Sequence, residues 1–185
     1  MRRLLLTLAL IPTVAEYNAD LLGSHIVFYD PVIEVPINTA EAKCLATMVY
    51  GEARGESEQG MVAVAYTAVN RAVNKTVCGV VLAPKQYSIF NNNPTLRAAA
   101  MSPNIEPKQK NIIDADAWEQ SMKVALSVLK KKVPDPTNGS THYLAPKVMA
   151  SKKYIYPKWS KQYQLVAVID NHKFYKPVDK KVAAS

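Results

Sequence analysis

The hydrophobic pattern changes its period along the chain, and this change limits the fold more than any other feature. Apolar residues recur at helical spacing in three segments, which we expect to form helices starting at Asn38 or Thr39, over Ser57–Val73 and over Asp114–Lys131. The later pattern turns to short runs typical of strands, "THYLA", "QLVAVI" and "HKFYKPV", with a hairpin turn at Asp170–Asn171. Helices followed by a small antiparallel β element indicate the α+β class.

Polar residues suited to capping stand near the predicted helix starts. Asn38 and Glu41 have the spacing of a capping box, as have Asp116 and Glu119, and Ser57 is placed to cap the second helix. The polar stretch 91–110 is rich in Asn and Pro. We expect it to be a mobile loop that faces the substrate.

The composition narrows the function classes. A formal net charge of +8 on 185 residues predicts attraction to polyanions such as nucleic acid, anionic lipid or an acidic wall polymer. No nucleic-acid-binding motif is present, so nucleic acid is not an expected partner. The three histidines are scattered and no HExxH or CxxC pattern occurs, so no metal site is predicted. Cys44 and Cys78 are compatible with one disulfide or with two buried thiols.

The stretch "YGEARGE" places a carboxylate on an apolar helix face. Leu45, Val49 and Glu52 follow one another at steps of four and three, so Glu52 continues the face that Leu45 and Val49 bury. A partly apolar cleft disfavours the ionised form of a carboxyl group, which suits it to donate a proton, as glycosidases require. The alternative is that Glu52 pairs with Arg54 on a solvated helix end.

The neighbouring residues suggest how this carboxylate is presented. Gly55 is expected to end the helix in the left-handed conformation, which places Glu52 in the last turn. Gly51 removes side-chain bulk, which lets a polymer approach closely. Glu56 is interpreted as a surface or helix-orienting residue, or as the second carboxylate of a hydrolase. If the helix continued, the β-carbons of Glu52 and Glu56 would lie about 6 Å apart.

Six motifs in order resemble the spore cortex-lytic enzyme (SleB-like) cell wall hydrolases. They are "YGEARGE", "GMVAVAYTAVNR", "TVCGVV", "KQYS", "DPTNGSTHY" and "NHKFYK", and they cover roughly Ala40 to Lys176. Two positions depart from the family pattern, which often has Phe at Tyr87 and Ala at Ser140. The resemblance implies a small lysozyme-like or lytic-transglycosylase-like helical domain with a short antiparallel β element.

The same resemblance implies an activity. A lytic transglycosylase would cleave the β-1,4 bond between N-acetylmuramic acid and N-acetylglucosamine in peptidoglycan, with Glu52 as the single acid/base and no cofactor. The candidate substrate-binding residues are Gln86, Tyr87, Ser88, Thr137 and Tyr143. The alternatives are a hydrolytic muramidase, with Glu56 as a possible second carboxylate, and a non-catalytic wall-binding or virion structural protein. Phage endolysins carry similar domains.

The N-terminus predicts where such a protein would act. "MRRLLLTLALIPTVA" joins two arginines to an apolar run of the length found in export signals. We therefore expect an export signal or signal anchor at 1–19, an extended lead-in at 20–38, a catalytic domain at 39–177 and a basic tail at 178–185. A buried N-terminal helix is the alternative for the first segment. The protein is expected to be a monomer exported to the periplasm or cell wall, with membrane contact through its N-terminal segment.

Overall fold

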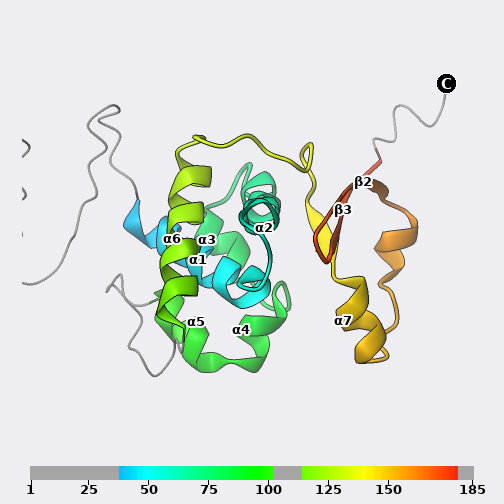
Figure 1. Cartoon of the computed structure of the whole chain (residues 1–185), viewed down its shortest axis with the longest axis horizontal. Coiled ribbons are helices and arrows are strands. Elements are labelled where there is room, and N and C mark those ends of the chain that lie inside the picture. Colours follow the sequence, from blue (N-terminus) through cyan, green and yellow to red (C-terminus); the bar gives the residue numbers. More distant parts are fainter. Residues whose placement is uncertain (1–37, 102–113, 179–185) are drawn as a thin grey trace, which may run out of the picture.

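The computed structural model describes residues 38–101 and 114–178. Figure 1 shows a group of helices on one side and a small sheet with one short helix on the other. The elements in chain order are α1 (Thr39–Ala53), α2 (Glu58–Arg71), α3 (Val77–Val81), α4 (Ser88–Asn92), α5 (Pro94–Met101), α6 (Ala115–Leu129), β1 (His142–Leu144), α7 (Pro146–Ser151), the 3-10 helix η2 (Lys158–Lys161), β2 (Gln164–Ile169) and β3 (His172–Lys176). The predicted α+β class is confirmed.

Some predictions fall on residues outside this description. The export segment 1–19, all of the lead-in except residue 38, and all of the basic tail except residue 178 lie there. Within 38–101 and 114–178, no helix is both long enough and apolar enough to span a bilayer.

Helix α1 is the centre of the core. The Asn38 side chain caps it as predicted, accepting hydrogen bonds from the N–H groups of Ala40 and Glu41 at 3.1 and 3.3 Å. Residues 42–50 are all buried, because α2, α3, α5 and α6 pack around the helix. A helix enclosed on all sides has no solvent-facing stripe. The predicted apolar stripe is therefore only part of the buried surface, which also includes Lys43 and Thr47.

Glu41 does not complete the capping box predicted from its spacing to Asn38. Its carboxylate accepts hydrogen bonds from the N–H groups of Val77 and Cys78 in the first turn of α3. A disulfide between Cys44 and Cys78 joins the same two helices, with 5.3 Å between the Cα atoms. The disulfide that the sequence left open is thus present, and it ties α3 to the central helix.

Helix α6 packs along α1 and starts slightly differently from the prediction. Asp114 is its N-cap and accepts from the Ala117 N–H at 2.9 Å, so the predicted Asp116–Glu119 capping box is wrong. Asp116 lies in the first turn instead, where its negative charge interacts favourably with the positive end of the helix dipole. The predicted cap of α2 is confirmed, since the Ser57 hydroxyl accepts from the Gly60 N–H at 3.2 Å.

The polar stretch predicted as a long loop is partly helical. It contains the end of α4 and all of α5, while residues 102–110 lie outside the described part. The Asn93 side chain accepts a hydrogen bond from the Leu96 N–H at 3.1 Å, and Pro94 opens the helix, a position where its missing N–H costs nothing. Leu96 and Ala100 are buried. These Asn and Pro residues therefore mark a helix start and not a loop.

The sheet has the strand order β1-β3-β2 and is antiparallel throughout. Ile169 pairs with His172, which confirms the predicted hairpin turn at Asp170–Asn171, and β3 buries Phe174 completely. The sequence did not predict α7 and η2, which lie between β1 and β2. The signal for α7 was Pro146 at its first position.

The Asp135 carboxylate organises the loop that joins the helices to the sheet. One oxygen accepts from the Thr137 N–H and hydroxyl at 2.8 and 2.6 Å, and the other accepts from the Asn70 amide and the Gly139 N–H, both at 2.9 Å. Burial by itself would raise the pKa of Asp135, but these hydrogen bonds outweigh burial and lower it. The loop is thus built around an ionised carboxylate.

Asp135→Asn should lower the free energy of unfolding at neutral pH by about 2 kcal/mol, because the new amide group faces donors and leaves them unpaired. A folded-state pKa below the ordinary value of 3.8 gives stability that is present above that value and is lost as the pH falls through the folded-state pKa. Urea unfolding at pH 7 and at pH 3 measures the difference in free energy of unfolding between the wild type and Asp135→Asn. This difference should be smaller at pH 3. Glu119→Gln, on an exposed part of α6, should show no comparable loss, and an equal loss would contradict this role of Asp135.

Candidate active site

Glu52 lies in the last turn of α1, as predicted, and is half-buried. The helix ends at Ala53, but Gly55 is not in the left-handed conformation, because Gly139 has the only positive glycine φ among the described residues. The predicted end is thus correct and the predicted backbone conformation is wrong. Arg54 is exposed and its guanidinium lies 4.9 Å from the Tyr50 ring centre. The alternative interpretation placed Glu52 on a solvated helix end, whereas the structure places it in a half-buried position.

Two donors from distant parts of the chain hold the Glu52 carboxylate. Oε1 accepts from the backbone N–H of Ile89 in α4 at 3.3 Å, and Oε2 accepts from the Tyr143 hydroxyl of β1 at 3.1 Å. Burial raises the pKa of Tyr143 well above its usual value, and the nearby Glu52 and Tyr87 raise it further. The phenol therefore keeps its proton and acts as the donor. The carboxylate lies where α1, α4 and β1 meet.

Gly51 has a different role from the one predicted. A Cβ atom at this position would lie 1.3 Å from Cδ1 of Ile89 and 3.2 Å from its Cβ. The space beside Gly51 is therefore filled by Ile89, whose own N–H donates to Glu52. Gly51 is needed for the close approach of α4 to α1 and not for the approach of a polymer.

Gly51→Ala should destabilise the protein although alanine is the better helix former. Helix propensity favours alanine by about 1 kcal/mol, whereas overpacking a filled core costs about 1–3 kcal/mol, so we expect a net loss. The cost should be much smaller in an Ile89→Ala background, where the methyl group has room. Urea unfolding of both single variants and the double variant measures this coupling. An equal cost in both backgrounds would contradict the proposed contact.

Arg71, at the end of α2, gathers two of the predicted substrate-binding residues. Its guanidinium donates to the amide oxygen of Gln86 and lies 5.9 Å from the ring centre of Tyr87. Burial raises the pKa of Tyr87, and the charge of Arg71 opposes that shift. Gln86 is exposed, and the ring of Tyr87 is buried close to the charge of Glu52. Arg71 was not among the predicted site residues, because a cation in the last turn of a helix is usually explained by the helix dipole.

Thr137 does not extend this cluster. Thr137 is fully buried and donates its hydroxyl to Asp135, so it supports the loop before β1 and is not on the surface. The placement of the Ser88 side chain lies outside the described part of the structure. Of the predicted residues, the structure brings Tyr87 and Tyr143 to Glu52, and it links Gln86 to them through Arg71.

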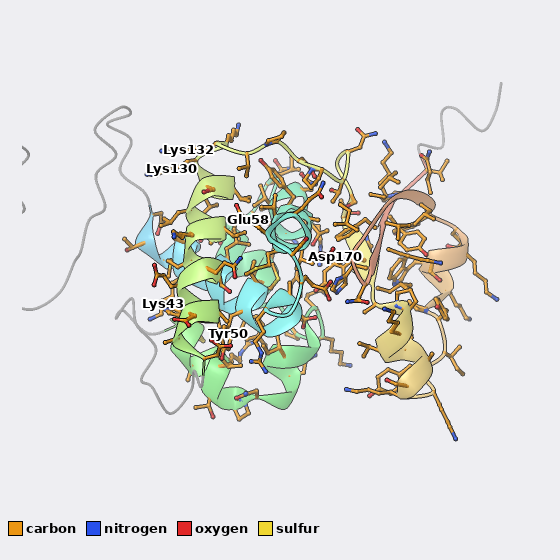
Figure 2. All side chains as sticks on the ribbon, viewed as in Figure 1. Lys43, Tyr50, Glu58, Lys130, Lys132 and Asp170 are labelled. Carbon is orange, nitrogen blue, oxygen red and sulfur yellow. A yellow bond between two sulfur atoms is a disulfide. The ribbon has the colours of Figure 1, made fainter. Side chains whose placement is uncertain are left out.

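Glu56 fixes the β2–β3 hairpin to the loop that follows α1. Its carboxylate accepts from the backbone N–H of Asn171 at 3.1 Å and from the amide of the same residue at 3.1 and 3.2 Å. Asp170 adds a second link, accepting from the N–H and hydroxyl of Ser57 at 2.9 and 2.6 Å. Figure 2 shows Asp170 between α2 and the sheet. These contacts set the position of the sheet, and with it Tyr143, relative to α1.

His172 lies inside this junction. It is buried, and its ring stacks edge-on against Tyr143 with 5.2 Å between the ring centres. Nδ1 is 3.8 Å from Glu56 Oε1, beyond hydrogen-bonding distance. Burial lowers the pKa of His172, while the charges of Glu56, Glu52 and Asp170 oppose this shift. The imidazole is therefore neutral at neutral pH and serves as packing support for Tyr143.

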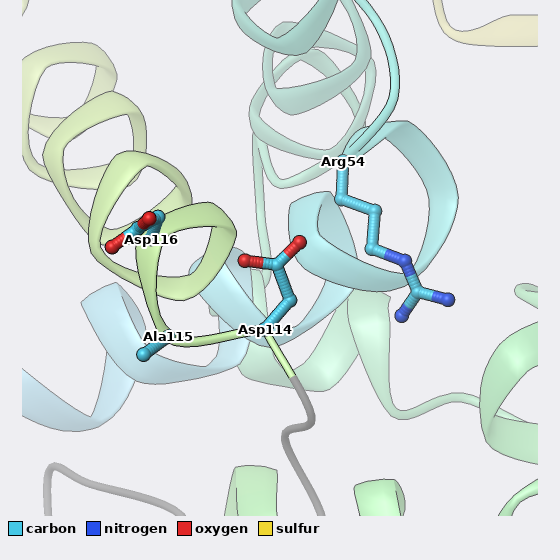
Figure 3. A pocket seen from close by; sticks show the side chains of 4 residues that line it. All are labelled: Arg54, Asp114, Ala115 and Asp116. Carbon is cyan, nitrogen blue, oxygen red and sulfur yellow. The ribbon is translucent and has the colours of Figure 1, made fainter.

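A separate pocket lies between the end of α1 and the start of α6. It measures about 500 Å³ and is lined by Arg54, Asp114, Ala115 and Asp116 (Figure 3). None of the predicted site residues lines it. Within the two described ranges, no three His, Cys, Asp or Glu side chains are grouped closely enough to hold a metal ion.

Comparison with known proteins decides the family. Residues 55–175 match the Cell Wall Hydrolase family. The chain belongs to the cell wall hydrolase family. The matched region contains Glu56, Tyr87, Tyr143 and the hairpin turn Asp170–Asn171. Glu52 lies three residues before the matched region begins.

Relatives of this family member include two solved structures. The catalytic domain of the Bacillus cereus SleB protein has a TM-score of 0.53 and 26% identity, and the match covers 74% of this chain and 90% of that one. The catalytic domain of the germination-specific lytic transglycosylase SleB from Bacillus anthracis has a TM-score of 0.55 and 25% identity, covering 76% and 97%. The predicted lysozyme-like fold, a helical domain with a small antiparallel sheet, is thereby confirmed.

A curated relative agrees with these structures. The spore cortex-lytic enzyme of Bacillus cereus is 29% identical over 117 residues, which are 60% of this chain. The matched region spans only 37% of that enzyme's length. The predicted resemblance to the SleB-like hydrolases is thus confirmed.

Proposed function

We propose that this protein is a lytic transglycosylase that cleaves peptidoglycan glycan strands between N-acetylmuramic acid and N-acetylglucosamine. The observation that carries the proposal is the Glu52 carboxylate, which is half-buried at the end of the central helix and held by donors from α4 and β1. Membership of the cell wall hydrolase family and the likeness to a domain described as a lytic transglycosylase support this assignment.

The proposed reaction uses one carboxyl group twice. Glu52 first gives its proton to the glycosidic oxygen, and the bond from that oxygen to the anomeric carbon breaks. The Glu52 carboxylate then takes the proton of the muramyl 6-hydroxyl, whose oxygen bonds to the anomeric carbon and closes a 1,6-anhydro ring. The Tyr143 hydroxyl and the Ile89 N–H fix the direction of the carboxyl group and stabilise its ionised form between the two steps.

The contacts of Glu56 favour a mechanism with a single carboxylate. Both oxygens of Glu56 accept hydrogen bonds from Asn171, so this residue already holds the hairpin in place. A muramidase using Glu56 as its second carboxylate would need these bonds to break or be shared with a water molecule. We therefore assign Glu56 a positioning role and keep hydrolysis as the alternative chemistry.

Gln86, Tyr87, Ser88 and Tyr143 are proposed to contact the glycan, joined by Arg71. Arg71 already bonds Gln86, which is exposed, so these two residues would present a polar surface to the sugar, while the buried ring of Tyr87 packs against Arg71. Thr137 is proposed to act indirectly, by holding the loop that leads to β1. The formal charge of +8 would draw the protein to an acidic wall.

We propose that the protein acts outside the cytoplasm, in the periplasm or cell wall, as a monomer. The apolar segment at residues 1–19 supports export. Purified sacculi with a covalent dye test the lytic function: the protein should release soluble dye, while a heat-unfolded sample should not. Binding to sacculi without release of dye would favour the non-catalytic alternative, and neither binding nor release would reject the substrate class.

A further inference from the structure

Three consecutive large side chains are exposed on the sheet side of the molecule. The exposed fractions of Tyr154, Ile155 and Tyr156 are 58%, 93% and 41%. A single exposed apolar residue is ordinary, but contiguous ones mark a surface that meets another body. We call these three residues the apolar loop. Val148, in the preceding helix α7, is also exposed.

The fold holds the apolar loop in this position from both ends. At its start, Lys153 has a φ of 54° and the Tyr154 N–H donates to the carbonyl of Met149 at 2.8 Å, which ends α7. Beyond its end, the Trp159 ring packs against His142 and Tyr175, with 4.9 and 5.5 Å between ring centres. The exposure of the loop is therefore set by anchored neighbours and is not the fraying of a free chain end.

The charged residues of the segment that carries the apolar loop are of one sign. Residues 136–169 contain no Asp or Glu. The cations of this segment are five exposed lysines: Lys147, Lys152, Lys153, Lys158 and Lys161. Acidic residues collect instead between α2 and α6, where a pocket of about 470 Å³ is lined by Glu58, Asp116 and Glu119. Figure 1 shows α7 and the segment after it on the side of the sheet away from α6.

We propose that the apolar loop and its lysines dock on a membrane surface that contains anionic phospholipids. In this arrangement Tyr154, Ile155 and Tyr156 enter the headgroup region, while the lysines reach the lipid phosphates. Apolar residues flanked by cations are the combination that interfacial binding requires, and tyrosine suits the boundary between water and hydrocarbon. The contact would keep the protein beside a membrane whether or not it cleaves glycan.

Other occupants fit these observations less well. A dissolved polyanion or an acidic wall polymer would account for the lysines, but it gives no reason for Ile155 to be 93% exposed. A second copy of the chain would cover the apolar residues, but it would bring two sets of five lysines together, which is unfavourable. A membrane accounts for both features at once.

The test uses the full chain and reads the loop directly. The sequence has two tryptophans, Trp118 in α6 and Trp159 beside the apolar loop. In a Trp118→Phe background, vesicles of phosphatidylglycerol with brominated acyl chains should quench the emission of Trp159, and phosphatidylcholine vesicles should not. The segment 1–37 contains no tryptophan, so this signal reports the loop and not the N-terminus. Absence of quenching in phosphatidylglycerol would overturn the proposal.

Co-sedimentation with the same vesicles provides a second readout that keeps Trp118. Lys152→Gln with Lys153→Gln should weaken binding roughly 25-fold, because each lysine near an anionic membrane contributes about a fivefold gain. Ile155→Ser should weaken it about tenfold or more. The matched controls are Lys75→Gln with Lys123→Gln, and Val73→Ser, which change exposed residues outside the sheet segment. Equal losses in the controls would overturn the proposal.

Two further outcomes would also overturn it. If the paired lysine variant lost binding to lipid-free sacculi but not to vesicles, the occupant would be a wall polymer. If sedimentation velocity showed a dimer that Ile155→Ser dissociates, the occupant would be a second copy. The variants should retain normal release of dye from sacculi, because none of them changes a residue near Glu52.

Discussion

Glu52→Gln is expected to reduce the release of fragments from sacculi by about 10²–10⁴-fold, the usual contribution of a general acid. Glutamine has nearly the same shape and keeps an oxygen that can accept from Tyr143 or from the Ile89 N–H. It cannot give up a proton to the glycosidic oxygen or take one from the 6-hydroxyl. The substitution therefore removes the chemistry and leaves the packing around the end of α1.

Two controls separate this effect from misfolding. Glu58→Gln makes the same change at an exposed position in the first turn of α2 and should retain activity. The melting temperature of Glu52→Gln should stay within a few degrees of the wild type, because the residue is half-buried and its partners remain. A Glu52→Gln variant that folds and still lyses sacculi at the wild-type rate would remove Glu52 from the mechanism.

Removal of the disulfide should produce the largest loss of stability. Cys44 and Cys78 are 34 residues apart, and closing a loop of this length corresponds to about 3–4 kcal/mol in the chain-entropy model. Cys44→Ala with Cys78→Ala should therefore lower the melting temperature by roughly 10 °C, given the usual relation for a chain of this size. The contact between Glu41 and the start of α3 remains, so we expect the fold to persist.

A reductant provides the matching control. Dithiothreitol should lower the melting temperature of the wild type toward that of the double variant and leave the variant unchanged. A wild-type protein whose melting temperature does not respond to the reductant, and equals that of the variant, would show that the bridge contributes no stability. Retained lysis at moderate temperature would confirm that the disulfide acts through stability and not through the site.

The fold was predictable to the extent that local signals agreed with the final packing. Asn38 and Ser57 cap the helices that their positions predicted, and Asp170–Asn171 forms the predicted turn. Glu41 behaves differently, because its carboxylate satisfies the start of α3 and not the helix that contains it. Asn93 caps α5 within a stretch that was predicted as a loop. Capping residues specify that some helix starts nearby, and only tertiary structure decides which one.

The arrangement of the candidate site was predictable only in part. Glu52 followed from its place at the end of a buried helix, and Tyr143 followed from a family motif. Gly51 was misread, because the isoleucine that fills its space comes from another helix. The burial of Thr137 against Asp135 was not predicted, because a hydroxyl that binds sugar and one that binds Asp135 look alike in sequence. Arg71 gave no distinctive local signal, so only the structure revealed its contacts.

Mass spectrometry of the fragments released from sacculi tests the central claim most directly. Wild-type protein should release fragments with 1,6-anhydromuramic ends, Glu56→Gln should give the same ends at a lower rate, and Glu52→Gln should give none. Reducing muramic ends from the wild type would contradict the transglycosylase chemistry. Anhydro ends from Glu52→Gln at the wild-type rate would contradict the assignment of the acid itself.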